Sequence, residues 1–437
     1  MHHHRMDLII RGTRVITSAG MRPATICIAD GKIRQIEEYA YPASANETVD
    51  AGALIVMPGI VDSHVHVNEP GRTDWEGFET ATLAAAAGGV TTLLDMPLNS
   101  IPATTTRAAL EEKRAAASGK CAINVEFIGG VVPGNSADLT PLRDAGVRAF
   151  KCFLTPSGVD EFQNVDEKDL REAFPVLADL GVPLMVHAED PSHLHPLIGA
   201  TRSYAEYLST RPVEAEHAAI ELLIRLLEWC PTPVHIVHLS SPSSLAIIAE
   251  GRGRGLPITV ETCPHYLTFA AEGIPDGATV YKCAPPIRSE TERDGLWAGL
   301  LAGEIDLIAS DHSPCPPALK ETRGDFLSAW GGIASIQHGL SAVWTGARAR
   351  GAGPEQIAEW MSRGPAKLAR LDSKGSIDVG YDADIAIWDA DASFVVDAAS
   401  LRQRHRITPY LDHELHGVVV GTWVGGRRVF SDERRLT

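Results

Sequence analysis

Apolar β-prone segments alternate with helical segments through residues 58–365, and this alternation restricts the fold more than any other feature. Strands of a parallel sheet covered by helices read as continuous apolar runs. The intervening stretches, such as 75–89, 214–230 and 290–304, space their apolar residues at helical intervals. Eight β–α units in this length predict a (β/α)8 TIM barrel. Its strands are expected at 60–66, 89–96, 122–130, 147–153, 182–189, 232–241, 257–266 and 305–312.

Both ends of the chain follow a different pattern. Residues 6–57 read as short strands of β-formers interrupted by Gly, Asp-Gly and Pro, and the same pattern returns at 375–391 and 414–430. Two strand-rich segments that flank a barrel predict one small β-sandwich assembled from both termini. We therefore expect residues 1–57 and 366–437 to form the sandwich, and residues 58–365 to form the barrel.

The charge balance limits the partners of the chain. The chain has 39 Lys and Arg and 56 Asp and Glu, so its formal net charge is −17. This negative charge argues against nucleic acid or an anionic membrane as partner. No apolar run approaches the roughly 20 residues that span a bilayer, and the N-terminus lacks a signal-peptide core. The seven scattered cysteines predict reduced thiols. We expect a cytoplasmic protein, and we interpret His2–His4 as a purification-tag remnant.

Side chains able to bind metals recur at the carboxyl ends of the predicted barrel strands. His64 and His66 end the first strand two residues apart, so they project to the same face. In a barrel the strand ends converge on one face, where catalytic groups gather. Imidazoles and a carboxylate there suit zinc, although cobalt, nickel, manganese and iron accept similar ligands. The later strands contribute Lys151, His187, His238 and Asp311.

Lys151 is the unusual member of this group, because a protonated ammonium has no lone pair to donate. Near cations its pKa must fall, and a neutral amine can add carbon dioxide to become a carbamate. A carbamate has two oxygens, which suits it to bridging two metal ions. A lone lysine at a strand end is ordinarily a surface charge. We expect carboxylation here because the other ligands share the same mouth.

Three further histidines compete for roles at the mouth. His235 lies three residues before His238 in one strand and faces the opposite way, which favours packing or support of a ligand. His265 is the main alternative to His238, which we prefer because it precedes a loop at the strand end. His312 adjoins Asp311 and should point away from the metal, in an orienting or structural role.

With these residues in place, the chain resembles the amidohydrolase superfamily, and within it the cyclic-amide hydrolases. Members of that group carry two metal ions held by four histidines, a carboxylated lysine and an aspartate. The resemblance implies hydrolysis of a small cyclic amide, and it points to a homotetramer. The matching positions are His64, His66, Lys151, His187, His238 and Asp311.

Flanking residues separate the subgroups. Asn68 stands where dihydroorotases carry an arginine, which would bind a carboxylate. Thr155 and Pro156 stand where hydantoinases and dihydropyrimidinases place a tyrosine. The segments EPGRTDWEGFETAT, MPLNSIPATT, KCAPPIR and AWGGIASIQ resemble the allantoinases, whose substrate, allantoin, is a neutral hydantoin ring with a ureido tail. The other two activities are the alternatives, and the intact ligand set disfavours a non-catalytic scaffold.

The resemblance also implies roles for individual residues. Asp311 is expected to carry the proton from water to the leaving nitrogen, with a purely structural ligand as the alternative. Substrate contacts are expected at Asn68 and through the backbone at Ala284 and Gly331.

Four neighbouring residues have an ordinary alternative. Arg72 and Glu69 are expected to form an ion pair within one loop or to contact the substrate. Trp75 and Trp330 are expected to pack in the core or to wall the pocket.

Overall fold

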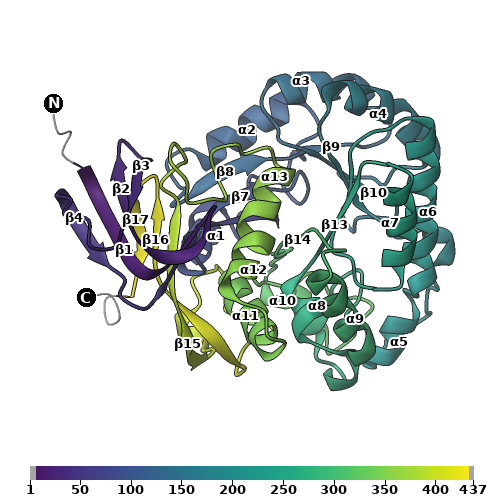
Figure 1. Ribbon diagram of the computed structural model, residues 1–437. Helices are drawn as coiled ribbons and strands as arrows, with labels where there is room; N and C mark the ends of the chain where they lie inside the picture. The colour runs from purple at the N-terminus through teal and green to yellow at the C-terminus, as the bar shows by residue number, and fades with distance from the viewer. Residues whose placement is uncertain (1–5, 433–437) are drawn as a thin grey trace.

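The computed structural model describes residues 6–432, which form a barrel with a β-sheet at its side (Figure 1). That sheet contains strands from both ends of the chain, which are far apart in the sequence. His2–His4, interpreted above as a tag remnant, lie outside the described residues.

The terminal sheet has the strand order β17-β16-β15-β5-β1-β2-β3, with β4 paired to β1. Strand β5 joins the two ends of the chain, because it pairs parallel with β1 and antiparallel with β15. This arrangement confirms a small β domain built from both termini, whereas the boundaries at 57/58 and 365/366 stay a prediction. Its strands are β1 (Met6–Thr17), β2 (Gly20–Ala29), β3 (Lys32–Glu37), β4 (Ala45–Asp50), β5 (Ile55–Pro58), β15 (Ile385–Val395), β16 (Glu414–Val424) and β17 (Arg427–Ser431).

The barrel strands pair in parallel in two runs, β6-β7-β8 and β9 to β14. A parallel bridge between Val65 and His312 brings β6 beside the segment that follows β14. The (β/α)8 class is confirmed. The strands are β6 (Ile60–Val65), β7 (Val90–Asp95), β8 (Asn124–Phe127), β9 (Gly129–Gly130), β10 (Phe150–Phe153), β11 (Leu184–His187), β12 (Val234–Ile236), β13 (Ile258–Thr262) and β14 (Leu307–Ile308).

One predicted strand, 122–130, is broken in two. Strand β8 pairs with β7, whereas β9 pairs with β10. The break precedes two glycines against which aromatic rings pack closely. A Cβ on Gly129 would lie 2.8 Å from the ring of Phe150, and one on Gly130 would lie 2.5 Å from that of Phe162. The strand therefore changes neighbours where a side chain would not fit.

Helices surround the barrel (Figure 1). The predicted segments 75–89 and 290–304 contain α1 and α9, and the predicted segment 214–230 coincides with α6 except for one residue at each end. Helix α9 begins with a capping box, in which Ser289 and Glu292 satisfy each other's backbone N–H groups. The helices are α1 (Phe78–Ala87), α2 (Arg107–Ala117), α3 (Leu139–Asp144), α4 (Glu167–Leu180), α5 (Tyr204–Ser209), α6 (Val213–Trp229), α7 (Ser244–Gly253), α8 (Pro264–Thr268), α9 (Glu290–Leu301), α10 (Pro317–Lys320), α11 (Gly339–Ala349), α12 (Pro354–Ala358) and α13 (Gly364–Leu368).

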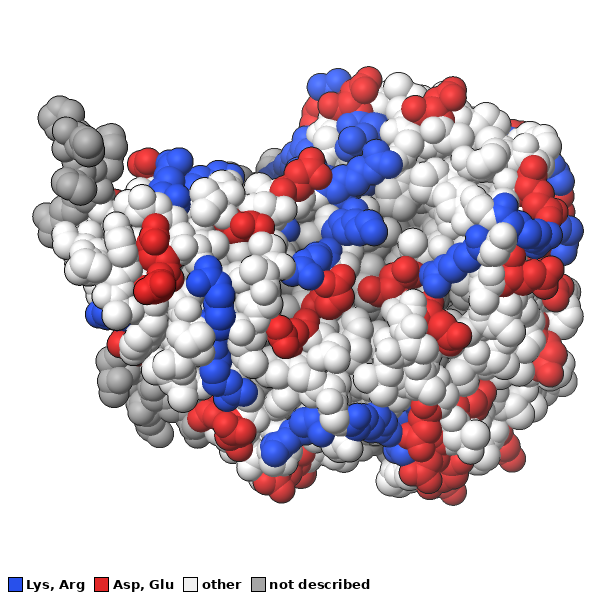
Figure 2. All heavy atoms as spheres, viewed as in Figure 1, with Lys and Arg blue, Asp and Glu red and all other residues white. Residues whose placement is uncertain are grey.

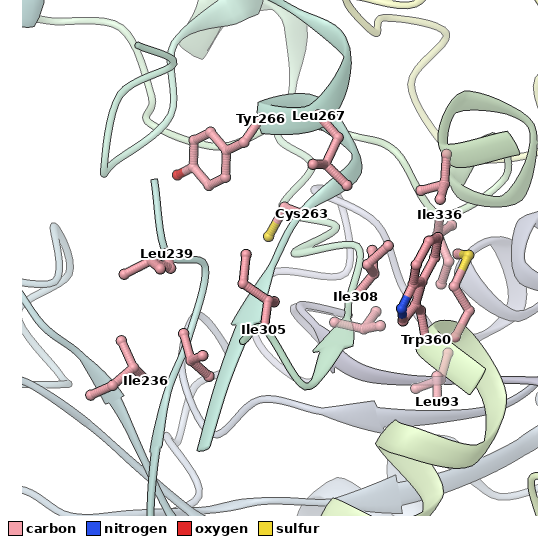
Figure 3. Close-up of a cluster of buried hydrophobic side chains, with 14 of the residues drawn as sticks. Leu93, Ile236, Leu239, Cys263, Tyr266, Leu267, Ile305, Ile308, Ile336 and Trp360 are labelled. Atoms are coloured by element: carbon pink, nitrogen blue, oxygen red, sulfur yellow. The ribbon is translucent and has the colours of Figure 1, made fainter. Parts of the chain in front are cut away.

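Apolar side chains from strands far apart in the sequence pack into one buried cluster (Figure 3). Leu93 of β7, Ile236 of β12 and Ile308 of β14 belong to one buried cluster with Trp360. The strands of the barrel are thus packed against the helical segment that contains Trp360.

The surface carries both signs of charge, and Figure 2 shows acidic and basic side chains interleaved on one face. Within residues 6–432, no helix is long and apolar enough to cross a membrane. All seven cysteines lie within residues 6–432, and none of them forms a disulfide there.

Candidate metal centre

The six predicted ligands lie together at the carboxyl ends of the barrel strands. Every one of them is buried, including Lys151, which is fully shielded from solvent. They adjoin a cavity of about 750 Å³, and all except Lys151 lie in its wall. The sequence prediction that these separate strand ends converge agrees with this placement. The roles of the six residues as ligands stay a prediction.

Three of the residues form a first cluster. Nε2 of His64 lies 3.3 Å from Oδ1 of Asp311, and Nε2 of His66 lies 3.4 Å from the same oxygen. Their donor atoms all lie within 4.8 Å of one another, a spacing that one metal ion can span. Ligands about 2.0–2.1 Å from a tetrahedral metal are separated by about 3.3 Å, so these spacings fit such an ion.

His187 and His238 form the second cluster. Nδ1 of His187 lies 3.0 Å from Nε2 of His238, and the ring of His238 lies 5.5 Å from that of His64, measured between centroids. The second cluster therefore adjoins the first. The two clusters together offer enough donors for two metal ions.

The charge of Lys151 acts on the histidines of both clusters. Its charge lowers the pKa of His66 in the first cluster and of His187 and His238 in the second, each after the larger effect of burial. Nζ of Lys151 is buried and has no hydrogen-bond partner among the described residues. Burying an amine without a hydrogen-bond partner is unfavourable in free energy. The site therefore fits a modified form of the Lys151 side chain that gains a further binding partner.

Two buried carboxylates hold the imidazoles in one orientation. Oε1 of Glu261 lies 2.6 Å from Nδ1 of His64, and Oε2 of Glu189 lies 2.6 Å from Nε2 of His187. A carboxylate accepts hydrogen bonds, so in a neutral imidazole the proton lies on the nitrogen facing it. The lone pairs of His64 and His187 therefore face the centre. Such carboxylate–histidine pairs are typical of metal sites.

This orientation provides a test of whether a metal fits. With its proton directed at Glu261, His64 turns a lone pair on Nε2 toward the carboxylate oxygen of Asp311, 3.3 Å away. Two acceptors face one another, which is unfavourable unless a cation lies between them. The donor set thus fits divalent metal ions at this position.

Burial sets the protonation of the cluster. It lowers the pKa of His66 to about 4 and that of Lys151 to about 8, because a buried cation loses its hydration. Burial raises the pKa of Asp311, but the charges of His64 and His66 outweigh this and hold it below its usual range. At neutral pH, therefore, His66 is a neutral donor and Asp311 is a carboxylate.

Backbone strain marks two of the residues. His238 and Asp311 have φ angles of 41° and 44°, in the left-handed region that non-glycine residues seldom adopt. Such conformations cost roughly 1–3 kcal/mol each and cluster at functional sites. The chain turns sharply where each side chain enters the mouth.

The competing histidines support the site or lie beside it. Nε2 of His235 lies 2.9 Å from Glu261, so this ring supports the carboxylate that orients His64. His265 is buried in α8 and does not line the cavity, whereas His238 does. Nδ1 of His312 accepts hydrogen bonds from the backbone N–H groups of Ser335 and Ile336. This residue therefore has an orienting role within the loop.

Sequence reasoning missed the residues that support the ligands. Glu189 accepts a forked pair of hydrogen bonds from Arg211, at 2.9 and 2.6 Å, and Arg211 also lines the cavity. A charged residue inside an apolar run, such as Glu261 in PITVETC, is the signal that would have found them.

The expected substrate contacts are placed unequally. Ala284 and Gly331 both line the cavity and lie close together, since a Cβ on Gly331 would be 3.9 Å from the backbone nitrogen of Ala284. Asn68 is fully buried and is not part of the cavity wall, whereas Asn99 is. Contact of Asn68 with substrate stays a prediction, and its side chain bonds to Asn99.

The ion pair expected between Arg72 and Glu69 was wrong, and substrate contact stays the other prediction for these two residues. Arg72 pairs with Glu161, and Glu69 pairs with Lys120, so the two do not bond to each other. Their loop folds onto other parts of the chain, which spacing along the sequence does not reveal.

Of the two tryptophans, Trp330 lines the cavity. The ring of Trp75 packs edge-on against it, with centroids 4.8 Å apart. Trp330 therefore walls the pocket, and Trp75 packs against it without lining the cavity.

A (β/α)8 barrel whose mouth gathers buried imidazoles, a lysine and an aspartate defines the class of metal-dependent hydrolases. Residues 55–429 match the Amidohydrolase family, and the chain belongs to that family. The allantoinase of Streptomyces avermitilis is 49% identical over 98% of this chain and 96% of its own length. The allantoinase of Arabidopsis thaliana is 42% identical, over 98% and 89% respectively.

Solved structures show the same architecture. An L-hydantoinase (dihydropyrimidinase) from Arthrobacter aurescens superposes with a TM-score of 0.92 at 32% identity, covering 98% of this chain and 96% of that one. The two barrels and their β domains therefore share one fold.

Proposed function

We propose that this chain hydrolyses the cyclic amide of allantoin to give open-chain allantoate. The observation that carries the proposal is the similarity to allantoinases over nearly the whole chain. The neutral residues in the cavity wall, among them Asn99, Thr155 and Ser313, suit an uncharged ring bearing a ureido tail.

The proposed cofactors are two divalent metal ions, with zinc the first choice and cobalt, nickel, manganese or iron the alternatives. Lys151 would bridge them as an N-carboxylated side chain. The remaining ligands would be His64, His66, His187, His238 and Asp311. When bound, such a pair of ions polarises a carbonyl and lowers the pKa of an attacking water from 15.7 toward about 7.

Asp311 is the proposed proton carrier. Its pKa is held below the usual range, so it is an acceptor at neutral pH, and it lines the cavity. It would take a proton from the attacking water and pass it to the nitrogen that leaves the ring carbonyl. The leaving nitrogen would otherwise depart as an unstable anion.

Backbone groups at Ala284 and Gly331 are proposed to hold the ring. They face one wall of the cavity side by side, where a substrate can meet both. Because main-chain groups would make these contacts, a larger side chain at Gly331 would act only by filling part of the cavity.

We also propose that the protein is cytoplasmic and assembles as a homotetramer. Light scattering of the purified protein measures the second point directly. A monomer would contradict it without affecting the reaction assigned to each chain.

A substrate panel tests the proposed function. Purified protein loaded with zinc should turn over allantoin with a higher kcat/KM than hydantoin, dihydrouracil or dihydroorotate. The close structural match to a hydantoinase makes hydantoin the second candidate. Preference for hydantoin or dihydrouracil would reassign the substrate, and preference for dihydroorotate would show that the pocket accepts an anion.

A further inference from the structure

Two buried lysines bond to the segments that carry the proposed ring-holding groups. Lys282 and Lys320 are 9% and 6% exposed. Burial lowers the pKa of each to about 8, because a buried cation loses its hydration, so both are mainly ammonium groups at neutral pH. An ammonium donates N–H groups and accepts none. The acceptors that the two ammoniums meet within residues 6–432 are main-chain carbonyls.

The first lysine ties the turn at Ala284 to the segment before Gly331. Lys282 precedes Ala284 by two residues. Its Nζ donates to the carbonyl oxygens of Leu327 and Ala329, at 3.1 and 2.6 Å. These two acceptors belong to the stretch of chain that leads into Gly331. One side chain therefore limits how far the two ring-holding groups can move apart.

The second lysine connects the same two segments from helix α10. Nζ of Lys320 donates to the carbonyl oxygen of Lys282 at 2.9 Å and to that of Trp330 at 2.8 Å. The carbonyl of Lys320 accepts a hydrogen bond from Oγ1 of Thr279 at 2.6 Å. The backbone N–H of Trp330 donates to the carbonyl of Leu319 at 2.8 Å. Helix α10 is thus bonded to both segments, although Lys320 itself does not line the catalytic cavity.

The main chain at Ala284 and Gly331 is left free to bind a ligand. The carbonyl oxygens immediately before and after Ala284 accept hydrogen bonds from the hydroxyls of Tyr207 and Tyr266, each at 2.6 Å. The backbone groups of Ala284 and Gly331 have no hydrogen-bond partner within the described residues 6–432. Ala284 is partly exposed and Gly331 is exposed, and both line the cavity, so a ligand can reach them.

We propose that Lys282 and Lys320 are positioning residues, which set the spacing of the two main-chain segments that hold the cyclic amide. This inference rests on the proposed function and names the side chains that shape this part of the site. Two loose loops would lose conformational freedom when the ring binds, and the preformed connection removes that cost. Contacts to the ring are made before and during the reaction, so the lysines should act on KM more than on kcat.

Substitution of Lys320 is the sharpest test, because this residue does not line the cavity. Lys320→Met keeps an unbranched side chain of similar length and removes the donors. It should raise the KM for allantoin about tenfold and change kcat less than about threefold. Lys282→Met should raise KM by at least as much. Lys374→Met is the matched control, since this mostly buried lysine pairs with two aspartates outside the cavity wall, and it should change neither constant.

Metal content and thermal melting are measured for every variant, since a general loss of structure would change them. Unchanged KM in Lys320→Met would overturn the proposal. So would a fall in kcat and metal content at constant KM, because the lysine would then support the metal centre. If Lys320→Met does not fold, Lys320→Gln replaces it. This variant keeps an N–H donor of shorter reach and should raise KM about threefold, and an unchanged KM would contradict the proposal in the same way.

Hydantoin, which has the ring but no ureido tail, shows which part of the substrate is affected. It is measured as a substrate or as a competitive inhibitor. Because the two segments are proposed to hold the ring, Lys320→Met should weaken hydantoin and allantoin by the same factor. An effect on allantoin alone would overturn the assignment to the ring.

Failure of the proposed function gives a different result. The unaltered protein would then not hydrolyse allantoin, and the KM comparison is made with the cyclic amide that it does hydrolyse.

Discussion

The barrel mouth and the terminal sheet are both built on β-strands, but the side chains that they bury differ in polarity. In the sheet, β-branched residues such as Ile10, Ile26, Val56 and Ile385 are buried against one another in an apolar cluster. At the mouth, imidazoles, carboxylates and an amine are buried together, and Nζ of Lys151 has no hydrogen-bond partner in the part of the chain that the structure describes. The sheet follows the rules of stable packing, and the mouth departs from them.

This difference indicates that the barrel mouth is less stable locally than the sheet, because its residues serve metal binding and catalysis. Burying a polar group without a partner is unfavourable, and His238 and Asp311 add strained backbone to it. Departures of this kind are expected at functional sites and are compensated by the rest of the fold. Changes at the mouth should therefore alter metal binding and activity, and changes in the sheet should alter stability alone.

The largest effect is expected from Lys151→Ala. Loss of the bridging anion should remove the metal ions and lower kcat/KM by about 1,000-fold or more, and added acetate should partly restore both. Elemental analysis and turnover measure the result. Lys374→Ala is the control from the sheet side, since it breaks ion pairs with Asp382 and Asp384, none of which lines the cavity. A Lys151→Ala protein with full metal and activity would erase the contrast.

A smaller loss is expected from Glu261→Gln. The carboxylate receives hydrogen bonds from His64 and His235, and an amide can orient only one of them in the same way. Metal affinity should fall about 10–100-fold, as measured by competition with a chelator. Unchanged affinity would mean that packing alone holds His64.

A pH effect of about fivefold is expected on reactivation of the metal-free protein. Burial lowers the pKa of Lys151 to about 8, and only the neutral amine adds carbon dioxide. The neutral fraction therefore rises with pH, and between pH 7 and 8 it grows about fivefold. At constant dissolved carbon dioxide and zinc, activity should return correspondingly faster. A rate independent of pH over this interval would argue against carboxylation of a free amine.

The smallest effect on activity is expected in the sheet. Ile26→Val removes one buried methyl group and should lower the free energy of unfolding by about 1 kcal/mol. Denaturation measures the stability, while kcat, KM and metal content should stay unchanged. A loss of metal in this variant would show that the two regions are energetically coupled.

The fold could be predicted from the sequence because its signals are local. Each barrel strand lies within an apolar run, and helices α1, α6 and α9 follow segments of helical spacing. The split of 122–130 into β8 and β9 could not be predicted, because it depends on the rings of Phe150 and Phe162 against two glycines. Packing between distant segments leaves no mark on local periodicity.

The site shows the same division. His64, His66 and the other proposed ligands stand at strand ends, where the barrel geometry brings them together. Glu189 and Glu261 escaped notice because their value lies in which imidazole nitrogen they face. Asn68 drew attention by its position near His66, whereas the residue in the cavity wall is Asn99. Sequence spacing identifies the segment that reaches a site more readily than the side chain that enters it.

Anomalous diffraction at the zinc edge, from crystals grown with zinc and bicarbonate, tests the metal centre most directly. Two peaks should lie about 3.5–4 Å apart among His64, His66, His187, His238 and Asp311, joined by a carbamate on Nζ of Lys151. A single peak, or two peaks beside an unmodified lysine, would contradict the account.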